Sequence, residues 1–207
     1  RAGSHDPLED VRFLEVETTM WLSQIIKREW PKMARTVESG AIELYSLLEE
    51  RLSGLAIKRA HIFEAVRKTG LNAEKPTSWS EDDLLKFLDA LRGIAKPMLI
   101  AGNKIDLEPS EHNVERLKSS NYIVMPCSAE AELALRRAAE KGMIDYRPGD
   151  SSFNILKPEG ITEVQKKALQ TIREKVLLRF GTTGVQEAIN MAYFKLLNMI
   201  VVYPVED

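Results

Sequence analysis

The chain has 207 residues, of which 44% are apolar and 29% charged, a composition that excludes a disordered or a fibrous protein. Its 29 lysines and arginines nearly balance its 31 acidic residues, and a net charge of −2 argues against a protein that coats nucleic acid through bulk charge. The single cysteine, Cys127, excludes an internal disulfide framework and suits a reducing compartment, so we expect a cytoplasmic protein. The longest unbroken apolar run has five residues, which predicts no membrane segment.

Helical patterns fill the first 95 residues. A helix is predicted to begin at Asp6-Pro7, with Asp as the N-cap, and to run past Lys27 until Pro31 kinks or ends it. Apolar spacing predicts further helices over 37–52 and 61–68, and another that starts after a capping box at Ser80 and ends at Gly93. The face of the first helix that we expect to be buried comprises Val11, Leu14, Thr18, Trp21 and Ile25.

The pattern changes after residue 96. The runs 97–101 and 122–125 are almost wholly apolar, as in strands buried on both faces of a parallel sheet. A helical segment that starts near Ser110 lies between them, so the sequence predicts a βαβ unit. The fold class that we predict is therefore α/β.

Three helices and a strand are predicted in the remainder. An alanine-rich helix covers 129–141, and a capping box at Thr162 opens a helix that runs to about Phe180. Thr183 with Gln186 is predicted to cap a helix that runs to about Met199, and residues 200–203 are predicted to form a strand stopped by Pro204.

One motif carries specific chemistry: Asn103-Lys104-Ile105-Asp106, at the carboxyl end of the first predicted strand. Ligands of open parallel sheets bind at this edge. The Asp106 carboxylate offers two acceptors that match the adjacent N1–H and N2–H donors of guanine, whereas adenine would leave it unpaired. Lys104 can lay its methylene stem over the base, and Asn103 can tie neighbouring loops together. An ordinary strand-to-helix turn is the alternative interpretation.

A second element follows the next strand. In Cys127-Ser128-Ala129 the backbone N–H of Ala129, at a helix start, is well placed to donate to guanine O6. Taken alone, Ser128-Ala129 is more simply a helix cap. Because adjacent parallel strands end at the same edge, the two elements can converge on one base.

Asn-Lys-x-Asp followed one strand later by Ser-Ala resembles the guanine-recognition pair of Ras-like GTPases. The wider sequence resembles the Obg-related YchF GTPases in their archaeal form. The segments that carry this resemblance are HDPLED at 5–10, WSEDDLL at 79–85, KPM at 96–98, YIV at 122–124, RFGTTGVQE at 179–187 and VYPV at 202–205.

The resemblance implies the C-terminal part of a P-loop GTPase sheet, with an inserted α-helical hairpin and a C-terminal TGS domain that this chain lacks. Residues 1–27 would be a G-domain helix, 28–75 the coiled-coil-like insertion, and 76–207 the remainder of the G domain. The nucleotide-binding residues that it implies are Asn103, Lys104, Asp106, Ser128, Ala129 and Glu130. Relatives with Glu at the place of Asp106 often prefer ATP, so Asp106 favours GTP here.

The catalytic half of such a GTPase is missing from the sequence. No G-x-x-x-x-G-K-[S/T] motif occurs in it, and the chain begins with Arg1 rather than Met, so we expect a fragment without the P-loop and switch regions. Mg²⁺ is expected only with that N-terminal part. We therefore expect no GTP hydrolysis by this chain alone.

Two other interpretations stay open. The basic cluster Lys27, Arg28, Lys32 and Arg35 is most simply a solvated face, but the family's link to translation suggests contact with the ribosome or ribosomal RNA. The chain would then be a non-catalytic helical interaction module that binds the ribosome or another protein. On either interpretation we expect it to bind neither DNA nor membranes. Cys127 is expected to be a buried strand residue, with a redox sensor as the alternative.

Overall fold

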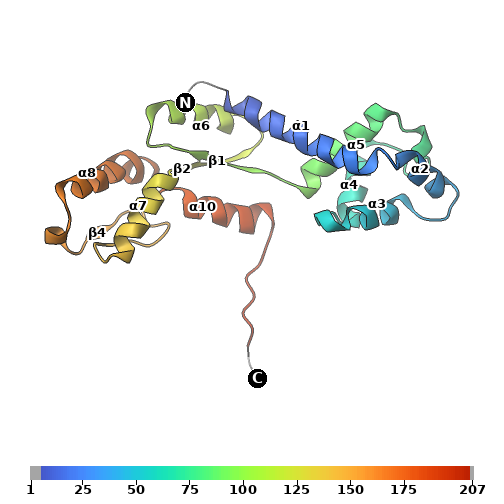
Figure 1. Cartoon of the computed structure of the whole chain (residues 1–207). Helices are drawn as coiled ribbons and strands as arrows, with labels where there is room; N and C mark the ends of the chain where they lie inside the picture. Colours follow the sequence, from blue (N-terminus) through green and yellow to red (C-terminus); the bar gives the residue numbers. More distant parts are fainter. Residues whose placement is uncertain (1–5, 206–207) are drawn as a thin grey trace. The chain divides into compact units, whose positions relative to one another are not determined.

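The helices and strands group into two units in the computed structural model, which describes residues 6–205 apart from the side chain of residue 109 (Figure 1). Glu9–Pro97 form a helical unit, and most of the other described residues form an α/β unit. The helical unit contains α1 (Pro7–Ile26), α2 (Trp30–Glu38), α3 (Leu44–Leu52), a 3₁₀ turn (Ser53–Leu55), α4 (Arg59–Thr69), a 3₁₀ turn (Pro76–Ser78) and α5 (Glu81–Ala95).

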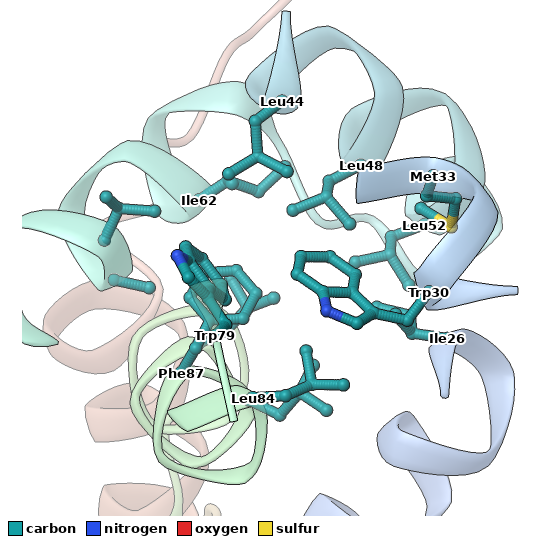
Figure 2. Close-up of a cluster of buried hydrophobic side chains, with 14 of the residues drawn as sticks. Ile26, Trp30, Met33, Leu44, Leu48, Leu52, Ile62, Trp79, Leu84 and Phe87 are labelled. Atoms are coloured by element: carbon teal, nitrogen blue, oxygen red, sulfur yellow. The ribbon is translucent and has the colours of Figure 1, made fainter. Parts of the chain in front are cut away.

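The core of the helical unit is built around two tryptophans. The ring centroids of Trp30 and Trp79 lie 5.1 Å apart, and those of Trp79 and Phe87 lie 5.3 Å apart. Figure 2 shows these rings directed toward one another, with the leucines of α3 beside them. The side chains that close this core include Ile26, Met33, Leu44, Leu48, Leu52, Ile62 and Leu84. The predicted insertion, 28–75, thus shares one core with α1 and α5, and its assignment as a separate part of the chain stays a prediction.

The start of α1 is confirmed, but its predicted buried face is wrong. Leu8 N donates to Asp6 Oδ1 at 3.0 Å, as expected of an N-cap. Leu14 and Trp21 are 51% and 45% exposed. The buried residues are Thr19, Leu22, Ser23 and Ile26. The helix carries apolar residues around most of its circumference, and polar contacts with α5 select the face: Thr19 Oγ1 donates to Asp89 Oδ1 at 3.1 Å, and Arg92 pairs with Glu15 at 3.1 Å.

Three other helix boundaries in this unit differ from prediction. α1 ends at Ile26, before Lys27, and Pro31 does not end it but stands in the first turn of a new helix, where its missing N–H costs nothing. The predicted helix 37–52 is two helices, because α2 ends before Gly40, whose φ of 77° is left-handed, and α3 begins only at Leu44. Gly93 does not end α5, which continues to Ala95. The capping box at Ser80 is confirmed, with Asp83 N donating to Ser80 Oγ at 3.1 Å.

The α/β unit is centred on a parallel pair of strands. β1 (Leu99–Asn103) pairs with β2 (Ile123–Cys127), and α6 (Glu108–Lys118) connects them, so the predicted βαβ unit is confirmed. α6 and α10 both contact this pair. The strands are only partly buried: Ile123 is 38% exposed and Ala101 is also exposed. The prediction of strands buried on both faces is therefore wrong for this chain, because among the described residues β1 and β2 pair only with each other.

The remainder of this unit is mainly helical. The capping box at Thr162 is confirmed, and the helix that it opens reaches Phe180 through a π-helical turn. A short antiparallel pair, β3 with β4, was not predicted because each strand has two residues. The elements are α7 (Ala129–Glu140), β3 (Ile144–Asp145), β4 (Asn154–Ile155), a 3₁₀ turn (Pro158–Gly160), α8 (Glu163–Ile172), a π turn (Arg173–Leu177), α9 (Leu178–Phe180), α10 (Val185–Asn190) and a π turn (Met191–Leu196).

Two predictions near the C-terminus are wrong. Thr183 does not cap α10: the N-cap is Gly184, without a side-chain bond. The Thr183 hydroxyl instead donates to Glu132, far away in sequence. Residues 200–203 form no strand, and Ile200 and Tyr203 are 82% and 79% exposed, because no other described strand offers them a ladder.

Candidate functional site

The two predicted motifs lie side by side because the strands that precede them are in register. Asn103, the last residue of β1, pairs with Cys127, the last residue of β2. One further backbone bond extends this pairing, from Ile105 N to Cys127 O at 3.2 Å. The Ile105 side chain is 1% exposed and anchors the first loop to the interior. The residues on either side of it, Lys104 and Asp106, are left at the surface edge of the sheet.

Lys104 adopts a backbone conformation that is uncommon for a residue with a side chain. Its φ is +69°, in the left-handed region, and its carbonyl accepts a hydrogen bond from Leu107 N at 3.0 Å. A left-handed conformation costs roughly 1–2 kcal/mol outside glycine. Such strain is found most often at ligand sites, where the turn sets the direction of neighbouring groups. The Lys104 side chain is exposed.

Asn103 ties the two loops together. Its Oδ1 accepts hydrogen bonds from the backbone N–H of Lys104 at 2.8 Å and from that of Ala129 at 3.0 Å. The Ala129 N–H, which we expected to be available to guanine O6, is therefore engaged by Asn103 here. A base could take this donor only by sharing it with the Asn103 carboxamide or displacing that group.

Ser128 and Asp106 form the second link between the loops. Ser128 Oγ donates to Asp106 Oδ1 at 2.9 Å and accepts from Ala131 N at 3.4 Å, so the residue both caps α7 and orients the carboxylate. Ser128 is 1% exposed. Asp106 is half-buried, and within residues 6–205 no donor contacts its other oxygen, Oδ2. One carboxylate oxygen is thus held in place while the other is left for a ligand.

A cavity of about 290 Å³ opens beside these residues, between α7 and the helical segment that contains α8. Asp106, Ser128 and Glu130 line its polar end. Its apolar wall comprises Ala131, Ala134, Ala168, Ile172 and Val176. Of the six predicted nucleotide-binding residues, the structure brings three to this cavity and joins Asn103 and Ala129 beside it, while Lys104 lies at the exposed turn.

Sequence reasoning missed a buried polar cluster behind the Ser128 loop. Glu132, one helical turn after Ser128, is 4% exposed. Its Oε2 accepts from Tyr146 Oη and from Thr183 Oγ1, both at 2.6 Å, and its Oε1 accepts from Arg136 Nε at 2.6 Å. Burial alone would raise the pKa of Glu132, but these three donors outweigh it and lower the pKa. Burial, and then the bond to Glu132, raises the pKa of Tyr146.

Cys127 is a buried strand residue, as predicted. It is 3% exposed, and burial, followed by the nearby charge of Glu187, raises the pKa of its thiol to about 11. Relative to the ordinary value of 9.0, this shift reduces the reactive thiolate at pH 8 by about a hundredfold.

We therefore expect Cys127 to react with an alkylating reagent at pH 8 at least about a hundredfold more slowly in the native chain than in urea. Mass spectrometry at timed intervals would follow the modification. Native labelling as fast as in urea would contradict the burial and revive the redox-sensor interpretation.

Among residues 6–205 no three His, Cys, Asp or Glu side chains gather where they could hold a metal ion. No described helix is long and apolar enough to cross a membrane.

The comparisons with known proteins agree with this fold and show the family of the chain. Residues 101–207 match the family model described as Obg-like GTPase YGR210-like, G4 motif-containing domain, and the chain belongs to this family. It is 45% identical over 206 residues to a protein of Methanocaldococcus jannaschii named "Uncharacterized GTP-binding protein MJ1332", covering 99% of this chain and 51% of that one. It is 28% identical over 215 residues to "Uncharacterized GTP-binding protein C428.15" of Schizosaccharomyces pombe, covering 98% and 51%.

A solved structure shares the fold. The crystal structure of a GTP-binding protein from Pyrococcus horikoshii OT3 superposes with a TM-score of 0.77 at 43% identity, over 98% of this chain and 54% of that chain. The chain spans about half the length of the relatives that it matches.

Proposed function

We propose that this chain carries the base-reading part of a GTP-binding site, and that the longer protein binds and hydrolyses GTP. The observation that carries the proposal is the Asp106 carboxylate, held at Oδ1 by Ser128 while Oδ2 has no donor among the described residues. Guanine presents two donors to such a group, and adenine presents one acceptor and one C–H. The relatives reported above are all named as GTP-binding proteins, which supports the same ligand.

The remaining roles follow from the positions of the side chains. Lys104 would cover the base with its methylene stem, Asn103 would hold the loops together, and Ala129 would offer its N–H to O6 after partial release from Asn103. Glu130 lines the same cavity. Phosphate and Mg²⁺ would be held by a P-loop outside these 207 residues, which contain no such motif. We also propose that the chain belongs to the YchF branch and that the longer protein is cytoplasmic. The part of that protein that carries the P-loop would complete the G-domain sheet.

The test uses guanosine monophosphate, because the phosphate cradle is not in this chain. We expect GMP to shift the backbone amide signals of 103–107 and 128–131 in an NMR titration of the ¹⁵N-labelled chain. A few hydrogen bonds to a base correspond to a Kd on the order of 1 mM. AMP at the same concentrations is expected to leave these signals in place. Equal responses to GMP and AMP would refute guanine recognition.

A non-catalytic interaction module is the second candidate. Arg28, Lys32 and Arg35 are exposed, and none of them has an ion pair among the described residues, whereas Lys27 pairs with Glu81 at 2.9 Å. Such a basic corner of α1 and α2 would suit the phosphates of ribosomal RNA. If GMP leaves the amide signals of the chain unchanged in the titration, the interaction module becomes the better-supported interpretation.

A further inference from the structure

The loop 181–184 packs against residues 126–128 through two hydrogen bonds and one close approach of the backbone. Ser128 N donates to Thr183 O at 2.8 Å. The Cys127 thiol donates to Gly184 O at 3.3 Å. A Cβ on Gly184 would lie 1.8 Å from Pro126 O, so the loop approaches the end of β2 as closely as a backbone can. The motif Gly-Thr-Thr-Gly, which lies more than 50 residues further along the chain, is therefore part of the wall behind Ser128.

Thr183 is held in this position through its side chain. It is 0% exposed, and its hydroxyl donates to Glu132 Oε2 at 2.6 Å. A short, charge-assisted bond in a buried place fixes geometry more firmly than a surface contact. A chain of hydrogen bonds thus runs from the Glu132 carboxylate through Thr183 to the Ser128 backbone, and from the Ser128 hydroxyl to Asp106.

We infer that Thr183 and Glu132 are positioning residues for guanine recognition: they fix Ser128, and through it the orientation of Asp106, without contacting the base. This inference rests on the proposed function. The hydroxyl of Thr183 sets where its carbonyl lies, and that carbonyl sets where the Ser128 backbone begins α7. Loss of the hydroxyl allows Ser128 to move, and the Asp106 carboxylate loses its fixed orientation.

The cluster supplies its own matched control. Tyr146 donates to the same carboxylate oxygen as Thr183, at the same 2.6 Å, but no bond leads from Tyr146 to Ser128. Thr183→Val and Tyr146→Phe each remove one buried hydroxyl and keep the side-chain volume. In both variants Glu132 retains two donors, so neither leaves an orphaned carboxylate. Only Thr183→Val removes the bond from Thr183 to Glu132; Tyr146→Phe leaves that bond in place and removes the contacts that the Tyr146 hydroxyl makes with Glu132 and Thr183.

The experiment compares GMP and AMP affinities of the full 207-residue chain and its variants by NMR titration. We expect Thr183→Val to reduce the GMP-over-AMP preference about tenfold, the effect of one lost hydrogen bond, and Tyr146→Phe to leave it unchanged. Thr183→Ser, which restores the hydroxyl, is expected to recover the preference. Glu132→Gln provides a second route, because it weakens the same anchor if Thr183→Val fails to fold.

The outcomes distinguish guanine recognition by the chain from the positioning role of Thr183 and Glu132. If the unaltered chain does not prefer GMP, the proposed function fails. If it does, and Thr183→Val keeps the full preference, or Tyr146→Phe loses as much as Thr183→Val, the cluster serves the fold alone and the positioning role is overturned. Glu132→Gln with an unchanged preference would have the same meaning.

Discussion

Asp106→Asn is expected to move the preference of the chain from guanine to xanthine. In the proposed site the carboxylate would accept both donors of guanine, and an amide replaces one acceptor by a donor. Each charge-assisted bond contributes about 1.5–3 kcal/mol, so GMP binding should weaken at least about a hundredfold. Xanthine carries a carbonyl at the position of the guanine amino group and can accept from the new NH₂. Ser128 can still donate to the amide oxygen, so the loop itself should be preserved.

The measurement is a titration of each variant with GMP and with xanthosine monophosphate, followed at the amides of 103–107. Asp82→Asn, an exposed position in the first turn of α5, makes the same chemical change in the other unit and serves as the control. It should bind GMP like the unaltered chain. If Asp106→Asn also binds GMP normally, Asp106 does not read the base.

Local signals in the sequence were reliable where the bond that they predict is itself local. The capping boxes at Ser80 and Thr162 form as expected, because each involves residues three positions apart. Asp106 and Ser128 meet for a related reason: each follows a strand, and parallel strands bring their carboxyl ends to one edge. The arrangement of the motifs could therefore be predicted before any coordinates.

Predictions failed where a distant partner competes for a residue. Thr183 with Gln186 has the same spacing as Thr162 with Gln165, yet only Thr162 caps a helix. The difference is Glu132, a buried carboxylate whose need for donors outweighs a surface cap. No local pattern reveals such a competitor. The prediction of the buried face of α1 failed for a similar reason, because polar contacts with α5 determined which of two apolar stripes is buried.

The proposed base-reading edge thus depends on three segments, of which only two carry a motif that the sequence analysis assigned to the base. β1 and β2 supply the loops, and the segment 181–184 fixes the second loop from behind. The Ala129 N–H is already bonded to Asn103, so a guanine base at the proposed site would have to compete with a contact inside the protein. Base binding and the packing of the loops are consequently linked, and changes behind the site should alter recognition without touching the ligand.

Gly184→Ala is expected to destabilise the α/β unit strongly. The new Cβ would lie 1.8 Å from Pro126 O, 2.9 Å from Pro126 C and 3.2 Å from Cys127 Cα, all backbone atoms of β2 that cannot move without disturbing the strand. The φ of +75° adds the cost of a left-handed alanine. We expect a loss of about 4 kcal/mol or more in the free energy of unfolding, a large share of what holds a small domain together.

Gly181→Ala is the control that separates the steric clash at position 184 from the cost of a left-handed alanine backbone. Gly181 has a φ of +84° and nothing within 4 Å of its Cβ position, so this variant should cost only about 1–2 kcal/mol. Urea unfolding followed by the amide signals of β1 and β2 reports on the affected unit. Trp21, Trp30 and Trp79, the three tryptophans of the chain, lie within Glu9–Pro97, and their fluorescence reports separately on the helical unit. Because Gly184 is pressed against β2, which ends at Cys127, equal losses in the two variants would mean that this close approach does not exist in solution.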